Sequence, residues 1–242
     1  MTTTERKLTL EHPHVTIASG CLEWEQPRPD LEHLGAVELL TRMAHELKGN
    51  VRIARFSDGL RLLAEVRYDG WEHDLEEQLQ RLGQSLTGGS VSTGHDDSRS
   101  DVDVDLLSSV LAELPGPWTE RDDAWVRPLP GTASGELVVE PVAGCIRCRA
   151  LLLASEPSLE GEVLLATAGY LLAAHRSLRL CRAQLDAVGV HVVSTAALDD
   201  LSTNLADSLE AVVTAVRLMA GSLRVLQIPA AAKHYIRHMK LS

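Results

Sequence analysis

Apolar residues in the second half of the chain recur every three or four positions along two long stretches. The first stretch predicts an amphipathic helix over residues 159–187, which Gly189 is expected to end. The second predicts a closing helix over residues 201–226. Burying one leucine contributes roughly 1.5–3 kcal/mol, so helices with such long apolar stripes must pack on other elements. The stripe of the first helix ends with Leu178, Cys181 and Leu185, and that of the closing helix consists of Leu201, Leu205, Leu209, Val212, Val216, Met219, Leu223 and Leu226.

Strands are expected where apolar and polar residues alternate. Residues 135–154 predict a two-stranded hairpin, the natural partner of the two helices, and residues 190–194 predict a further short strand. Extended alternation also marks the first thirty residues, which are expected to form one or two strands.

The first half of the chain shows the same kinds of element. Residues 34–47 predict a helix that stops at Gly49-Asn50, and residues 51–56 and 60–68 predict two strands joined by the turn Ser57-Asp58-Gly59. A second helix is expected to carry the leucines of residues 75–86.

Residues 87–105 consist almost wholly of Gly, Ser, Thr, Asp and His, a composition that predicts a flexible acidic linker. A helix near residues 106–114 follows it. The order helix, strand, turn, strand and helix therefore runs twice along the chain, and it predicts an α+β protein of two tandem modules, the second closed by a long C-terminal amphipathic helix. The predicted divisions are N-terminal strands at 1–30, a first module at 31–86, the linker at 87–105, a second module at 106–228 and a basic C-terminal tail at 229–242.

Composition narrows the function classes. The 242 residues carry a formal net charge of -11 with a pI of about 5.3, which argues against a general binder of nucleic acid or of anionic membranes. No apolar run reaches the roughly 18 residues of a membrane span, and the first residues lack a signal-peptide pattern, so a cytoplasmic location is expected. Four cysteines form no disulfide framework.

This order of elements in an acidic chain resembles the type III secretion chaperone-like fold, which YbjN-like proteins share. The resemblance covers residues 34–86 and 103–226. It implies a non-enzymatic binder, chaperone- or adaptor-like, that holds partly unfolded segments of a client protein on its sheet and helix surface. It also implies a homodimer that works without ATP or another cofactor.

Candidate partner-binding residues lie on the predicted strands. Leu63, Leu151 and Leu153 are apolar, and Arg147 and Arg149 alternate with the last two leucines on a face not plainly part of the core. A mixture of apolar and charged side chains on a strand suits the docking of a client protein.

A histidine phosphotransfer protein is the alternative interpretation. His45, Lys48 and Gly49 resemble its motif, in which an exposed histidine takes the phosphoryl group, the lysine favours its charge and the small glycine lets a receiver domain approach. In such helical bundles the chain continues as helix after the glycine, whereas residues 50–68 alternate with period two. The other interpretation of this segment is a helix end capped by Gly49.

Cys145 and Cys148 have the spacing that binds zinc or performs thiol exchange. On a regular strand, however, residues three apart point to opposite faces, so a structural role with one half-buried and one buried thiol is favoured. The chain contains no phosphate-binding glycine loop, no dinucleotide fingerprint, no nucleophile elbow and no H-E-x-x-H motif. No metal site or catalytic residue is therefore expected.

Overall fold

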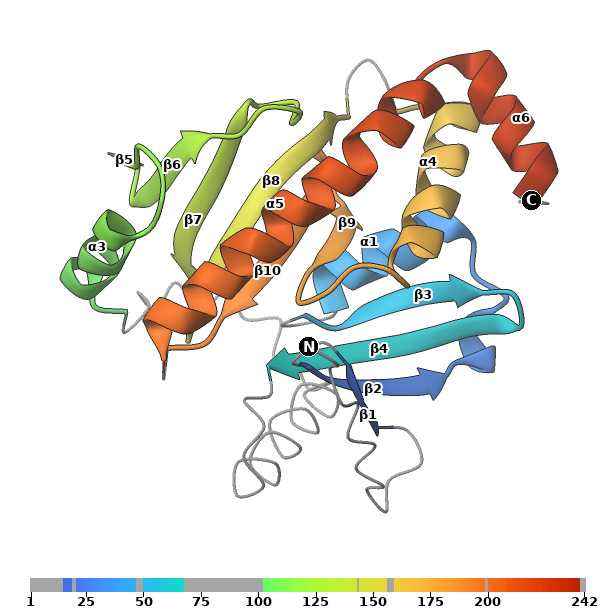
Figure 1. Ribbon diagram of the computed structural model, residues 1–242. Coiled ribbons are helices and arrows are strands. Elements are labelled where there is room, and N and C mark those ends of the chain that lie inside the picture. Colours follow the sequence, from blue (N-terminus) through green and yellow to red (C-terminus); the bar gives the residue numbers. More distant parts are fainter. Residues whose placement is uncertain are drawn as a thin grey trace, which may run out of the picture.

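The computed structural model describes residues 15–18, 21–46, 50–67, 102–142, 144–155, 159–198 and 200–239. Two antiparallel sheets make up its strands, and helices pack on and between them, so the predicted α+β class is confirmed (Figure 1). The first sheet has the order β1 (Val15–Ala18), β2 (Cys21–Pro27), β4 (Gly59–Arg67), β3 (Arg52–Phe56). The second has the order β5 (Thr119–Arg121), β6 (Ala124–Pro128), β7 (Glu136–Val142), β8 (Cys145–Ala154), β10 (Gly189–Ala196), β9 (Arg182–Leu185).

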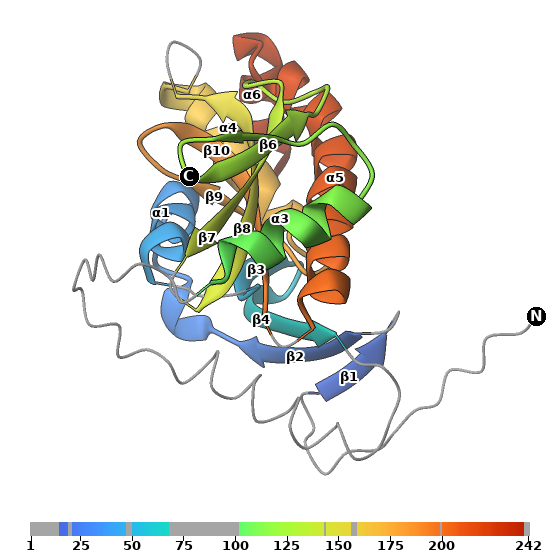
Figure 2. The same cartoon turned by 90° about the vertical axis from the view of Figure 1, so that its left-hand side faces the viewer.

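The helices divide between the second sheet and the region where the two sheets meet. α5 (Leu201–Leu226) lies across β8 and β10, and α3 (Val104–Glu113) lies on the same side of that sheet (Figure 2). α1 (Ala36–Glu46) contacts β3 of the first sheet, β9 of the second and α4 (Gly161–Ala174). α6 (Pro229–Met239) turns back onto α4, and a short 3-10 helix, η1 (Pro29–Leu31), precedes α1.

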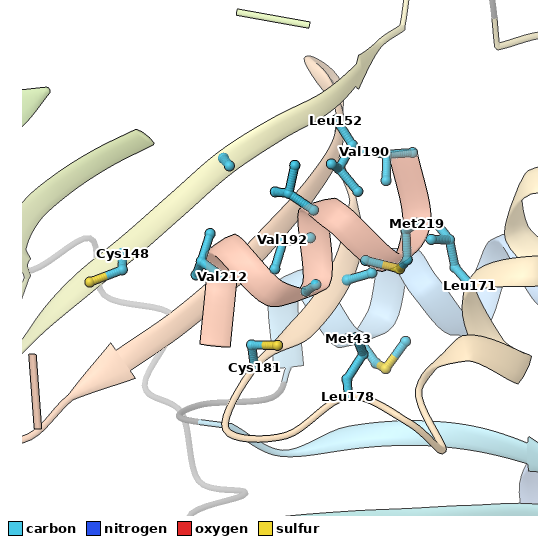
Figure 3. Close-up of a cluster of buried hydrophobic side chains, with 14 of the residues drawn as sticks. Met43, Cys148, Leu152, Leu171, Leu178, Cys181, Val190, Val192, Val212 and Met219 are labelled. Carbon is cyan, nitrogen blue, oxygen red and sulfur yellow. The ribbon is translucent and has the colours of Figure 1, made fainter. Parts of the chain in front are cut away.

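The closing helix is confirmed over the predicted residues. All eight residues of its apolar stripe are buried in α5, because this face packs on β8 and β10. Val212 and Met219 project from α5 toward Val190 and Val192 of β10 (Figure 3). The buried apolar residues of both sheets and of the helices belong to one core cluster.

The predicted helix over residues 159–187 is wrong in its second half. α4 ends at Ala174, and the chain then runs through Leu180, whose φ of +52° does not fit a helix, into the strand β9. Leu178 and Cys181 are buried as expected, but they lie in the irregular segment between α4 and β9 and not on a helix. Hydrogen bonds of the His175 ring to strands β3 and β9 accompany this change of direction.

Gly189 begins a strand and does not end a helix. Its φ is +146°, and a Cβ atom at this position would lie 2.0 Å from the carbonyl oxygen of Leu153. β10 is longer than the predicted strand, and it lies between β8 and β9 with nearly all of its residues buried. The close approach of two backbones at Gly189 explains why only glycine fits there.

In the first half, α1 and the hairpin of β3 and β4 confirm the expected helix and strands. β2, which the sequence placed in an N-terminal extension, pairs along its whole length with residues 61–67 of β4 in the first sheet. The helix expected over residues 75–86 and most of the predicted linker lie outside the residues that the structure describes. The last linker residues, 102–105, are ordered: Val102 is buried, and the Asp103 carboxylate caps α3 by accepting hydrogen bonds from the N–H groups of Asp105 and Leu106.

Within the described ranges, no single helix combines the length and apolarity that a membrane span requires. α5 and α6 meet those criteria only when taken together, and their axes are bent by 106° at the break between them.

Candidate functional site

Among the described residues, a group of buried charges lies between the two sheets and is centred on Arg52 of β3. Its side chain is fully buried and forms two hydrogen bonds of 2.9 Å to the carboxylate of Glu65 on β4. Two further hydrogen bonds of 2.8 Å run from its guanidinium to the backbone carbonyls of His175 and Leu178. The first sheet is thereby joined to the segment that leads from α4 to β9.

A second arginine extends this group toward the surface. Arg179 pairs with Glu65 at 2.6 Å and also with Glu23 of β2. The backbone N–H of Leu180 donates to Glu65 at 2.7 Å. Burial acts to raise the pKa of Glu65, but the charge and hydrogen bonds of Arg52 outweigh it and lower that pKa, whereas burial raises the pKa of Glu23. Two arginines and two glutamates give the group a formal charge of zero.

The ring of His175 connects the edge strands of the two sheets. Its Nδ1 lies 2.7 Å from the carbonyl oxygen of Ile53 on β3, so Nδ1 carries the proton and donates. Nε2 then accepts from the N–H of Ala183 on β9 at 2.9 Å. Burial lowers the pKa of His175 to about 4, so the neutral ring, which can both donate and accept, is the form present in the folded protein at neutral pH.

We call the group of Glu23, Arg52, Glu65, His175 and Arg179 the sheet junction. Its central side chains are fully buried, and their hydrogen bonds are made to each other and to the backbone. A buried ion pair with all its hydrogen bonds formed positions structural elements, and it leaves no surface for a ligand. The sheet junction is therefore structural.

A different kind of site lies on the second sheet. α5 covers one face of β8 and β10, and no described helix packs on the opposite face at β6, β7 and β8 (Figure 2). The register of the cross-strand pairs shows which side chains lie on this uncovered face. We call this set the open sheet face; it consists of Val126, Val138, Glu140, Arg147, Arg149 and Leu151.

The open sheet face mixes apolar and positively charged groups. Leu151 and Val138 are half-buried, and the side chains of Arg147 and Arg149 are 41% and 38% exposed. Nε of Arg147 donates to Oε1 of Glu140 at 2.7 Å. Nε of Arg149 lies 2.8 Å from the same oxygen, but its angle does not allow a hydrogen bond, so this contact is an ion pair only.

Of the five predicted partner-binding residues, the fold brings three together. Arg147, Arg149 and Leu151 share the open sheet face. Leu63 lies on the first sheet with 1% exposure, and Leu153 is 5% exposed beyond an irregularity in the pairing of β8 with β10. The last two leucines have almost no surface for a partner to contact.

Of the three residues of the alternative phosphotransfer interpretation, the described ranges include His45, near the end of α1. His45 is described by its backbone alone, as the penultimate residue of that helix, and Lys48 and Gly49 lie outside the described ranges. From Arg52 the chain is strand, where a phosphotransfer bundle continues as helix. The chain that follows α1 is therefore unlike the continuous helix of a phosphotransfer bundle.

Cys145 and Cys148 lie on opposite faces of β8, one half-buried and one buried, as the strand period predicts. Among the described residues, no three His, Cys, Asp or Glu side chains come together to hold a metal ion. A shallow hollow of about 300 Å³ lies at the bend between α5 and α6, where its lining includes His234, Tyr235 and His238. The two imidazoles stack with their centroids 6.5 Å apart.

The sheet junction was not predicted from the sequence. The strands of Arg52 and Glu65 carry other charged residues, Arg55 on β3 and Arg61 and Arg67 on β4. A charged residue on a strand is usually exposed, so nothing in these strands marked Arg52 and Glu65 as a buried pair. Nothing local indicated His175, because its partners are supplied by two distant strands.

Comparison of the chain with protein-family models found no match, and neither did comparison with curated protein sequences. The resemblance to secretion chaperones therefore stays a prediction from the order of the elements.

Proposed function

We propose that this protein is a protein-binding module, chaperone- or adaptor-like, that holds a segment of a partner protein against the open sheet face. The observation that carries the proposal is the combination of half-buried apolar side chains with two arginines on a sheet face that no described helix covers. Many antiparallel sheets expose one face to water, but a solvated face is usually polar throughout. Leu151 and Val138 depart from that pattern.

The remaining surface supports this choice of site. The opposite face of the sheet is filled by α5, and the sheet junction is buried. The large apolar side chains that stand exposed elsewhere are scattered over α3, α5, α6 and loops, for example Leu106, Leu218 and Val225. Single exposed apolar residues are normal on any protein, whereas a face that mixes anchors with charges suits recognition.

The test measures binding of an unfolded model client. Carboxymethylated α-lactalbumin, which cannot refold, is labelled with fluorescein and titrated with the full-length chain while its anisotropy is recorded. Leu151→Asp replaces an apolar contact of the open sheet face with a carboxylate on the same face as Arg149, and it is expected to weaken binding at least about tenfold.

Leu218→Asp is the matched control, because Leu218 lies on α5 with 57% exposure. This variant should bind like the unchanged protein, and circular dichroism should show that both variants are folded. If the unchanged chain does not bind the client, or if the two variants bind equally well, the proposed function is wrong.

A further inference from the structure

The two arginines of the open sheet face share a single carboxylate. Nε of Arg147 and Nε of Arg149 lie 2.7 and 2.8 Å from the same Oε1 atom of Glu140. The group thus carries one more positive than negative charge, within a chain whose net charge is -11. Burial lowers the pKa of the neighbouring His191, and the charges of Arg149 and Arg147 also act to lower it, against the charge of Asp186.

The hydrogen-bond donors of these arginines are only partly used. Nε of Arg149 is buried without a hydrogen-bond partner among the described residues, and in that part of the chain the terminal nitrogens of both guanidinium groups have none. A guanidinium carries five N–H donors and pairs best with a carboxylate through two parallel hydrogen bonds. The donors left over on the open sheet face therefore match carboxylates supplied from outside.

The spacing of the two arginines and Leu151 along β8 indicates which shape of segment could bind to them. Arg147, Arg149 and Leu151 follow one another on one face of β8, so successive side chains are about 7 Å apart. An extended segment has the same repeat. Two acidic residues at alternate positions, followed two residues later by an apolar residue, would meet the two arginines and Leu151 in register.

From these observations we infer that the partner segment is extended and acidic, with carboxylates that pair with Arg147 and Arg149 and an apolar side chain that packs on Leu151. This inference rests on the proposed function and specifies its partner. The acidity of the rest of the chain favours a short acidic segment over a nucleic acid, because a long polyanion would be repelled beyond this face. Attraction between exposed charges also weakens as salt is added.

The experiment uses two fluorescein-labelled peptides. The first carries glutamates at two alternate positions and a leucine two residues after the second glutamate, with serines between them, and the second has glutamines in place of the glutamates. The unchanged full-length chain is expected to bind the glutamate peptide at least about tenfold more tightly than the glutamine peptide, and raising the salt concentration should reduce this difference. The double variant Arg147→Gln, Arg149→Gln should lose the preference. The control variant Arg217→Gln, Arg224→Gln alters two exposed arginines of α5 and should keep it.

The outcomes separate this inference from the proposed function. Equal binding of both peptides, or a preference that survives in the double variant, overturns the acidic partner. In that case the proposed function still stands if Leu151→Asp weakens binding of the unfolded client. Tighter binding of single-stranded RNA than of the glutamate peptide, lost in the double variant, would also overturn it, because phosphates would then be the ligand. Thermal unfolding followed by circular dichroism checks that each variant is folded.

Discussion

Lowering the pH from neutral to about 5 should destabilise this protein, and the buried ring of His175 accounts for a measurable part of that loss. The pKa of a histidine in an unfolded chain is about 6.5, whereas burial lowers the pKa of His175 in the fold to about 4. Between these values the unfolded chain binds a proton that the folded chain does not. The stability contributed by the neutral ring is therefore present above pH 6.5 and is lost as the pH falls toward 4.

The magnitude follows from the two pKa values. Complete protonation of the unfolded state alone corresponds to about 3 kcal/mol, and at about pH 5 roughly 2 kcal/mol of this has been lost. Domains are typically stable by only about 5–15 kcal/mol, so the change is readily measured. Structurally, a charged ring could no longer accept the hydrogen bond from Ala183 while donating to Ile53.

Urea unfolding followed by circular dichroism, repeated from about pH 5 to about pH 7.5, measures this effect. His175→Gln should be less stable at every pH, but between pH 6.5 and 5 it should lose about 2 kcal/mol less stability than the unchanged protein. His33→Gln, at an exposed histidine, should keep the pH dependence of the unchanged protein. Glu23, whose raised pKa acts with the opposite sign, and His191, whose lowered pKa acts with the same sign, are present in all three proteins and cancel in their differences. If His175→Gln retains the full pH dependence, the assignment of a buried neutral ring is wrong.

Three further predictions follow from burial. Leu209→Asp should lower stability by several kcal/mol in thermal unfolding, whereas Glu210→Asp, at the exposed neighbouring position, should be nearly silent; equal melting temperatures would contradict the packing of α5. Arg52→Ala removes the buried partner of the Glu65 carboxylate, which keeps only the half-exposed Arg179, and it should cost about 3–5 kcal/mol in urea unfolding; Arg42→Ala, in an exposed pair, should cost less than about 1 kcal/mol. Of the four cysteines, Cys145 should react with iodoacetamide first in the folded protein, because burial raises the pKa of each of the other three thiols; mass spectrometry that finds another cysteine modified first would refute this.

The elements predicted correctly are those whose periodicity belongs to one segment. The stripe of α5 and the alternation of β7 and β8 each reflect the burial of a single face, and the pattern of such a face can be read from consecutive residues. Arg147, Arg149 and Leu151 were proposed together for the same reason, since residues two apart on one strand share a face.

The predicted partner-binding residues show what the alternation of a strand cannot predict. Alternation says which residues share a face, but not whether another layer covers that face. Leu63 and Leu153 are buried by residues that only folding brings to them, while Leu151 stays half-buried because no described helix packs on its face. Exposure is therefore a tertiary property.

The amino-acid sequence by itself determined the α+β class, the closing helix and the hairpins, because local periodicity selects secondary structure wherever one face is buried. Tertiary structure decided where α4 ends and what joins the two sheets. The spacing of Leu178 and Cys181 fits a buried helix face, but α4 ends just before His175, whose ring hydrogen-bonds to β3 and β9. Arg52 reaches the carbonyl of His175 across 123 positions of sequence. Contacts between residues so far apart in the sequence form only when both sheets have folded, so no local sequence pattern could predict them.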